Sequence, residues 1–187
     1  MARIEELVTA YKNHIGTPWQ KNLAGPQKTV FVVYPKADER RLRARLEDFE
    51  VATQQAGHGW KLLDFTTTFA RWMAATDYRE VYFEQPADLA MKLRSDFLKH
   101  VASELRTTLT GAGVDDNAVV AVYGVACLFG FARVSLVLKE VERSIQGRLV
   151  LFFPGEFENN NYRLLDARDG WNYLAVPITL HSGGEGL

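Results

Sequence analysis

The sequence predicts an α/β fold with three layers, in which a Rossmann-like, mostly parallel central sheet carries a C-terminal antiparallel hairpin at one edge. Two observations predict this class. Four short apolar runs are typical of strands, the first of the kind expected for a strand buried on both faces, and a helical pattern separates each run from the next. Such alternation is typical of parallel strands joined by crossover helices. The predicted strands are residues 29–34, 60–64, 118–124 and 148–153.

The first half of the chain contains two of these strands and three predicted helices. An amphipathic helix covers residues 4–14, and turn-forming residues then lead to the first strand, which Pro35 ends. Apolar residues recur at helical spacing over residues 37–56, while charged residues cover the opposite face. After the second strand, residues 66–75 are predicted to form a helix with an aromatic inner stripe.

The second half repeats the order of strand and helix. Large apolar residues follow one another at intervals of four over residues 86–110, which predicts a long helix. After the third strand, a bend of small residues at 124–130 leads to a helix over residues 131–145. Pro154 and Gly155 are then expected to end the fourth strand.

The last part of the chain differs from the alternating pattern. Residues 162–166 and 172–176 are predicted to form two strands of a hairpin, joined by a turn around Arg168 and added antiparallel at an edge of the sheet. Together these elements predict a single α/β domain over residues 1–180, followed by a flexible tail at 181–187.

Composition excludes several classes of function. The chain has 187 residues and is 47% hydrophobic, which suits a compact domain. Lys and Arg number 22 and Asp and Glu number 23, so the net charge of −1 gives no general attraction to nucleic acid, and direct DNA binding is not expected. The single cysteine, Cys127, has no disulfide partner, which favours a reducing cytoplasm. No apolar run reaches about 18 residues, so no membrane span is expected.

Candidate ligand-binding residues follow the predicted strands, because ligands of open parallel sheets bind at the carboxyl ends of the strands. The bend at 124–130 lacks the Gly-Lys-Ser/Thr ending of a P-loop and the Gly-x-Gly-x-x-Gly pattern of dinucleotide-binding proteins. The candidates are therefore single residues rather than a motif. They are Asp64, Gly124, Gly130, Arg133, Pro154 and Gly155.

Two of these candidates each have two interpretations. Arg133, expected in the first turn of a helix, could bind a carboxylate or phosphate, or it could brace the loop and pair with an acid such as Glu156. Both interpretations place a negative group nearby, because a helix N-terminus disfavours a cation. Asp64 could act as a general base or metal ligand, or it could cap the helix that begins near the threonines at 66–68.

Catalytic and metal-binding constellations are missing from the sequence. The four histidines show no metal-ligand spacing, and one cysteine cannot build a thiolate zinc site. No nucleophile and base can be assigned, and Cys127 lies in an apolar stretch typical of buried filler. No catalytic residue, metal or cofactor is therefore predicted, and a protein without enzymatic activity is favoured.

Several short motifs occur in a particular order in the C-terminal third. They are Val119–Gly124, Phe129–Val134, Leu149–Gly155, Tyr162–Leu165 and Trp171–Val176. In this order, and in Tyr34-Pro-Lys-Ala-Asp38 followed by an Arg/Leu-rich helix, the chain resembles the BrxB family of bacterial BREX phage-defence systems. The resemblance implies a cytoplasmic component of a multi-protein anti-phage system, with other BREX proteins, including a large PglZ-type protein, as partners. It supplies no known catalytic residue.

Two hypotheses of function follow. The first is a non-catalytic interaction subunit of a BREX-type complex, and the second is a small nucleotide- or phosphoester-binding protein with its site at the carboxyl ends of the strands. Exposed aromatic residues dominate the binding energy of protein interfaces, although aromatic residues also fill cores. The candidate interface residues, which could instead pack the domain's own core, are Tyr78, Tyr82, Phe83, Trp171 and Tyr173.

Overall fold

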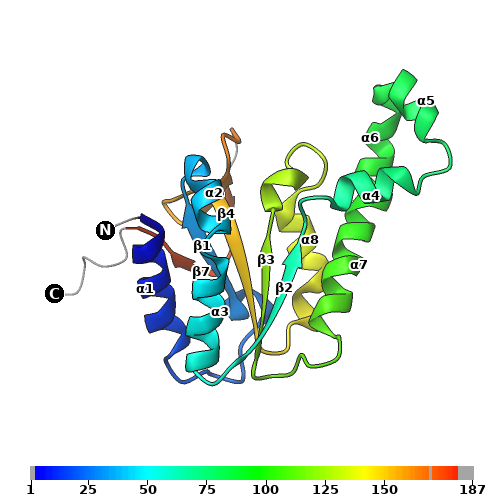
Figure 1. Cartoon of the computed structure of the whole chain (residues 1–187). Helices are drawn as coiled ribbons and strands as arrows, with labels where there is room; N and C mark the ends of the chain where they lie inside the picture. Colours follow the sequence, from blue (N-terminus) through cyan, green and yellow to red (C-terminus); the bar gives the residue numbers. More distant parts are fainter. Residues whose placement is uncertain (1–2, 169, 181–187) are drawn as a thin grey trace.

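A parallel sheet lies between two layers of helices (Figure 1). The computed structural model describes residues 3–168 and 170–180, so the predicted tail at 181–187 lies outside the described residues. The sheet has the strand order β2-β3-β4-β1-β7, and every neighbouring pair in it is parallel. This arrangement confirms the predicted α/β class.

Four of the five strands of the parallel sheet coincide with the predicted apolar runs, and the fifth is not among them. The five strands of the parallel sheet are β1 (Thr29–Tyr34), β2 (Gly59–Asp64), β3 (Ala118–Tyr123), β4 (Arg148–Glu158) and β7 (Val176–Ile178). Strands β1 and β4 pair from Thr29 and Leu149 to Tyr34 and Pro154, and every residue of β1 is buried. A strand buried on both faces has no polar side, which is why the runs of β1, β3 and β4 are continuously apolar. Strand β2 lies at the edge of the sheet and has no fully buried residue.

Three helices cover one face of the sheet. They are α1 (Arg3–Ile15), α2 (Glu39–Arg43) and α3 (Leu46–Gln55). Their apolar residues pack on Val30 and Phe152 of the sheet. The single helix predicted over 37–56 is wrong, because the chain breaks at Ala44 and Arg45. At the break, the Arg45 side chain pairs with Glu5 of α1 and with Asp48.

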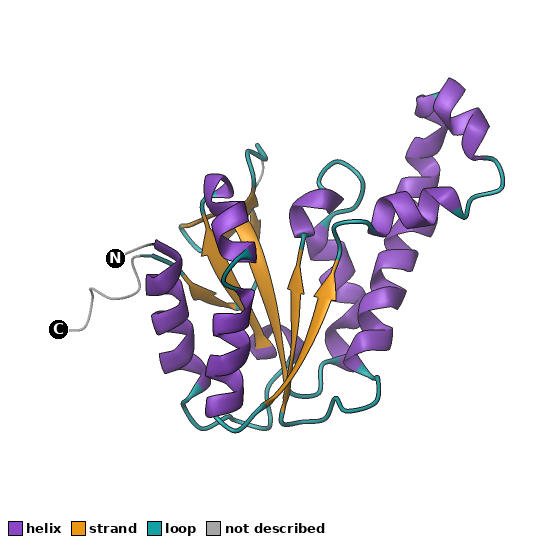
Figure 2. Ribbon diagram, in the orientation of Figure 1, coloured by secondary structure: helices purple, strands orange, loops and turns teal. Residues whose placement is uncertain are grey.

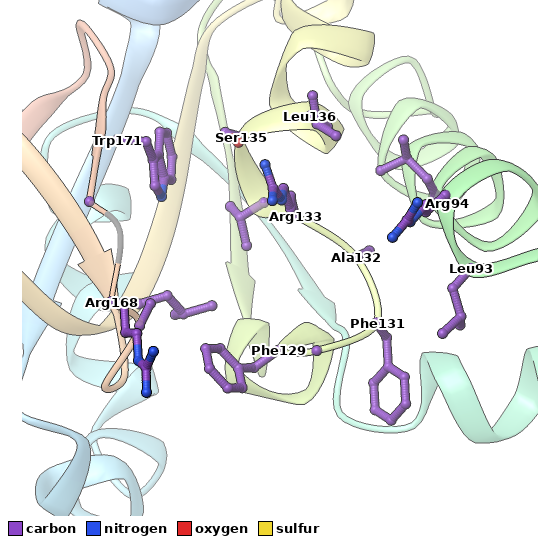
Figure 3. Close-up of a pocket in the computed structure, with 16 residues that line it drawn as sticks. Leu93, Arg94, Phe129, Phe131, Ala132, Arg133, Ser135, Leu136, Arg168 and Trp171 are labelled. Atoms are coloured by element: carbon purple, nitrogen blue, oxygen red, sulfur yellow. The ribbon is translucent and has the colours of Figure 1, made fainter. Parts of the chain in front are cut away.

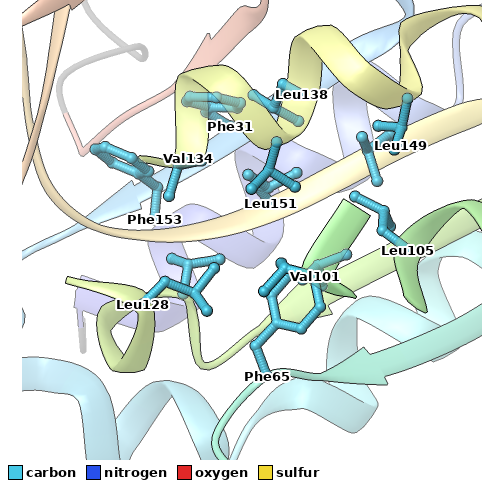
Figure 4. Close-up of a cluster of buried hydrophobic side chains, with 14 of the residues drawn as sticks. Phe31, Phe65, Val101, Leu105, Leu128, Val134, Leu138, Leu149, Leu151 and Phe153 are labelled. Atoms are coloured by element: carbon cyan, nitrogen blue, oxygen red, sulfur yellow. The ribbon is translucent and has the colours of Figure 1, made fainter. Parts of the chain in front are cut away.

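Two helices cover the opposite face. They are α7 (Leu98–Leu109) and α8 (Val134–Val141). Figure 4 shows their apolar residues against Phe31 and Leu151, which alternate along the strands with the residues that face α1 and α3. Helix α8 is shorter than the predicted 131–145, because the amides of Phe131 and Ala132 still bond to the carbonyl of Leu128 in a turn.

A helical arm, defined here as residues 68–97, extends past the carboxyl ends of the strands (Figures 1 and 2). It contains α4 (Thr68–Ala74), α5 (Arg79–Glu84), α6 (Leu89–Lys92) and a π-helical turn (Leu93–Phe97). Its base is fixed to α7, where Glu104 accepts hydrogen bonds from Thr68 at 3.0 Å and Arg71 at 2.7 Å.

The π turn has a cause in the sequence. Apolar residues at intervals of four overshoot an α-helical turn of about 3.6 residues, so their side chains drift around a regular helix. A wider π turn accommodates one extra residue and reverses much of this drift. Leu89, Phe97, Val101 and Leu105 are accordingly all buried. Short 3-10 helices complete the chain at Gly25–Lys28, Lys36–Asp38, Pro86–Asp88, Val125–Leu128 and Glu142–Ser144.

The C-terminal strands are arranged differently from the predicted edge hairpin. Strand β4 does not end at Pro154 and Gly155 but continues to Glu158, and its far part pairs antiparallel with β5 (Asn161–Leu164). A Cβ on Gly155 would lie 2.0 Å from the carbonyl oxygen of Arg163, so the glycine permits this pairing rather than ending the strand.

The second predicted hairpin strand, 172–176, is also wrong in part. Only β6 (Trp171–Asn172) pairs antiparallel with β5, whereas β7 joins β1 in parallel at the sheet edge. The hydroxyl of Tyr162 donates to the carbonyl of Ala175 at 3.0 Å and fixes the connection between the two strands. An antiparallel pair therefore exists, but it extends from β4 near the centre of the sheet.

Phe31 offers a test of the core. Its ring lies 4.3 Å from Tyr162 and 5.2 Å from Phe153 between ring centroids, and no part of it is exposed. Replacing Phe31 with Ala should lower the free energy of unfolding by about 3–5 kcal/mol, because it leaves a cavity. The matched variant Phe83→Ala removes an exposed ring and should change it by less than about 0.5 kcal/mol. Urea denaturation measures both, and equal effects would contradict this packing.

Candidate functional site

A polar cluster lies at the carboxyl ends of β1, β2 and β3. The hydroxyl of Tyr34 donates to Glu39, and the guanidinium of Arg43 donates to the same carboxylate at 2.8 Å. The Arg43 guanidinium also lies over the ring of Tyr123, 5.1 Å from its centroid. Arg43 is therefore committed to groups of this chain.

Asp64 joins this cluster at the end of β2. Its carboxylate accepts hydrogen bonds from the amide of Thr66 at 2.7 Å and from the Thr66 hydroxyl. Burial by itself would raise the pKa of Asp64, but hydrogen bonds from Thr66 and Tyr123 and the charge of Arg43 outweigh it and hold the pKa below its usual value. A carboxylate with a lowered pKa is a poor general base.

The cap predicted for Asp64 takes a different form. The N-cap of α4 is Thr67, which makes no side-chain cap bond, whereas Asp64 fixes the turn before the helix. Gly124 belongs to the same arrangement. Its φ is +77°, and a Cβ there would lie 2.7 Å from the Thr66 amide nitrogen and 2.9 Å from the Asp64 carboxylate. The structure therefore brings Asp64 and Gly124 together, because Gly124 packs against the turn that Asp64 forms with Thr66.

Cys127 lies close to this cluster, and burial raises the pKa of its thiol. Cys127 is half-buried rather than buried as expected, and a thiol with a raised pKa is less often the reactive thiolate. Pro154 and Gly155 lie apart from Asp64, inside the long strand β4. The carbonyl of Pro154 accepts a hydrogen bond from the amide of Leu165 at 2.9 Å. Both residues serve strand pairing.

Gly130 and Arg133 line a different feature, a pocket of about 750 Å³ on the α7 and α8 face of the molecule (Figure 3). Arg94 of the arm reaches toward the start of α8, and Arg168, in the connection between β5 and β6, lies on the opposite side (Figure 3). Apolar side chains, among them Phe129, also line the pocket.

Arg133 occupies the N-cap position of α8, one position before the first turn in which it was predicted to lie, and α8 has no side-chain cap. The expected partner Glu156 pairs instead with Arg163, its neighbour across β4 and β5, at 3.4 Å. Within residues 3–168 and 170–180, neither Arg133 nor Arg94 forms an ion pair. The predicted acidic partner is thus missing from the described part of the chain.

The candidate interface residues divide into two groups. Tyr78 and Phe83 are 72% and 64% exposed on the arm, and Tyr82 between them is half-buried. Trp171 and Tyr173 are half-buried and pack around Phe31, with ring centroids 5.7 and 5.9 Å away. The alternative that the aromatic residues fill the chain's own core therefore holds for Trp171 and Tyr173.

Sequence reasoning missed several residues of these surfaces. In the sequence, Arg94 is one of several charged residues on a predicted helix. Only the π turn and the tertiary fold place it across the pocket from Arg133. Arg168 was part of a predicted turn, with no signal that the turn faces α8. Met91, 82% exposed, lies outside the apolar residues that recur at intervals of four, and no signal in the sequence marks it as part of a surface.

The fold and these surfaces define a parallel α/β protein with a projecting helical arm and an arginine-lined pocket. No protein-family model, curated protein or solved structure matches the chain. Among the described residues, no group of three or more His, Cys, Asp and Glu side chains could hold a metal ion. No helix in the described part of the chain is both long and apolar enough to cross a membrane.

Asp64 predicts a pH dependence of stability. A carboxyl with a lowered folded pKa stabilises the fold above its unfolded pKa of about 3.9, and this contribution is lost as the pH falls through the folded pKa. Asp64→Asn should therefore lower the free energy of unfolding at pH 6, and the difference from the wild type should shrink below about pH 4. Denaturation at a series of pH values tests this, with Asp77→Asn as an exposed control. A constant difference across the series would contradict it.

Proposed function

We propose that this chain is a non-catalytic interaction subunit of a cytoplasmic, BREX-type anti-phage complex, and that it binds another protein of that complex, such as a PglZ-type protein. The order of motifs that resembles the BrxB family supports the choice of system. The observation that carries the interaction itself is the helical arm, on which Tyr78, Val81, Phe83 and Met91 are exposed although other apolar side chains of the arm pack on the core.

The arm exposes more large apolar side chains than its own packing explains. Helix α5 has no buried residue, although it carries Tyr78 at its N-cap and contains Val81 and Phe83, all of which are exposed. Met91 on α6 adds a fourth exposed apolar side chain. A six-residue helix is not stable alone in water, and contiguous exposed apolar surface is typical of interaction sites.

The residue types and charges of the arm favour a protein partner. Tyrosine, phenylalanine and methionine are enriched at protein interfaces. Residues 77–92 contain four acidic and two basic side chains, which would repel nucleic-acid phosphates. The charged residues are Asp77, Arg79, Glu80, Glu84, Asp88 and Lys92.

The proposal that the subunit is non-catalytic is supported by the state of its reactive groups. Asp64 has a lowered pKa and is engaged by Thr66 and Tyr123, and the pKa of the Cys127 thiol is raised. Neither group is tuned as a base or nucleophile at neutral pH.

Co-purification tests the interaction. The tagged chain should recover a PglZ-type protein encoded beside it, and the double variant Tyr78→Ala/Phe83→Ala should weaken the complex at least about tenfold, because each interface hot spot contributes about 2 kcal/mol or more. Its fold should be unchanged, since both side chains are exposed. Leu174→Ala is the matched control, because Leu174 is also 72% exposed but lies outside the arm.

Two results would contradict the proposal. One is recovery of the wild-type chain without any BREX-type protein, or with a partner that the double variant binds as well as the wild type does. The other is a nucleotide hydrolysis activity that Asp64→Asn abolishes, which would favour the phosphoester-directed hypothesis and assign turnover to the strand ends.

A further inference from the structure

The pocket in Figure 3 collects positive charge from three separate elements. Arg94 comes from the π turn, Arg133 from the N-cap of α8 and Arg168 from the β5–β6 connection. All three are exposed, and none has a carboxylate partner among the residues that the structure describes. Three like charges around one pocket repel one another, and a bound anion would relieve this repulsion.

The described residues that line the pocket include no acidic side chain. By contrast, most of the chain's other arginines are neutralised locally, as Arg71 is by Glu104 at 2.7 Å and Arg43 by Glu39 at 2.8 Å. In a chain with a net charge of −1, the absence of acidic side chains from the described part of the lining is a local property of this pocket.

The pocket also presents apolar surface. Phe129 is 46% exposed at its edge, and Leu136 and the half-buried Trp171 lie on other sides. Phe131 is held in place by stacking on Phe69 of the arm, with centroids 4.0 Å apart. A ligand that carried charge alone would leave these side chains in contact with water, so the lining suits a ligand with a flat, apolar body.

We propose that this pocket binds a small organic phosphate with a flat, apolar body, such as a nucleotide. The guanidinium groups of Arg94 and Arg133 would hold the phosphate, because arginine matches phosphate oxygens with paired hydrogen bonds, while Arg168 adds positive charge from the opposite side of the pocket. A phosphate monoester carries nearly two negative charges at neutral pH, whereas a carboxylate carries one. The ester therefore matches a pocket lined by several cations better than a carboxylate would. The volume of about 750 Å³ lies within the range of small-molecule pockets.

The start of α8 adds to the charge match. Val134 and Ser135, in its first turn, line the pocket beside Arg133. The partial positive charge of a helix N-terminus favours a bound anion. This site is separate from the Asp64 cluster, which packs with α2 on the other face of the sheet, so the proposal concerns binding and assigns no hydrolysis.

Isothermal titration with four probes tests the ligand class. AMP and phenyl phosphate should each bind saturably at one site per chain. Adenosine lacks the phosphate and inorganic phosphate lacks the apolar body, so each should bind at least about tenfold more weakly. If neither phosphate ester binds saturably at millimolar concentration, or if inorganic phosphate binds as tightly as both esters, the proposal is overturned.

Variants test the place of binding. Arg133→Ala and, independently, Arg94→Ala should each weaken AMP binding at least about tenfold, and Arg133→Lys should weaken it less, because charge remains without the planar fork. Arg143→Ala is the matched control, since Arg143 is exposed, forms no ion pair with a described residue and lies outside the pocket. Circular dichroism confirms folding of each variant. Equal weakening by Arg143→Ala, or AMP binding unchanged in both Arg133→Ala and Arg94→Ala, would overturn the proposal.

Discussion

The pairing of β1 with β4 is the constraint on which the rest of the structure depends. The two strands run side by side over six positions with both faces buried, so helices must cover the sheet on both sides. Phe31 and Phe153 face α7 and α8, while Val30 and Phe152 face α1 and α3. Because the loops after β1 and β3 leave toward opposite faces, the carboxyl edge is divided into the Asp64 cluster on one side and the arginine pocket on the other.

The sequence was most informative where burial is complete. Residues 29–34 and 118–124 could be predicted because a strand without a polar face leaves a continuous apolar run. The extension of β4 could not, since Pro154 and Gly155 are turn formers elsewhere, and only the close approach of Arg163 explains them here. Strand β7 was missed because it contains Pro177, which an edge position tolerates.

The candidate site shows the same division between local and tertiary information. Asp64 and Gly124 adjoin strand ends in the sequence, so topology alone brought them together. Arg133 was identified from its place near a helix start, together with the expectation of a negative group beside it. Arg94 and Arg168 required the tertiary fold, because one is 39 residues before Arg133 and the other 35 after it. No pattern in the chain marks such convergence.

The separation of α5 from the core has an evolutionary consequence. A buried residue is constrained by packing, so substitutions there are filtered first by stability and only then by partner choice. Helix α5 has no buried residue, and its side chains are free of that first filter. Its sequence can therefore change with a partner at little thermodynamic cost to the sheet, and relatives of this chain should diverge fastest at the arm while strands β1 and β4 keep their apolar pattern.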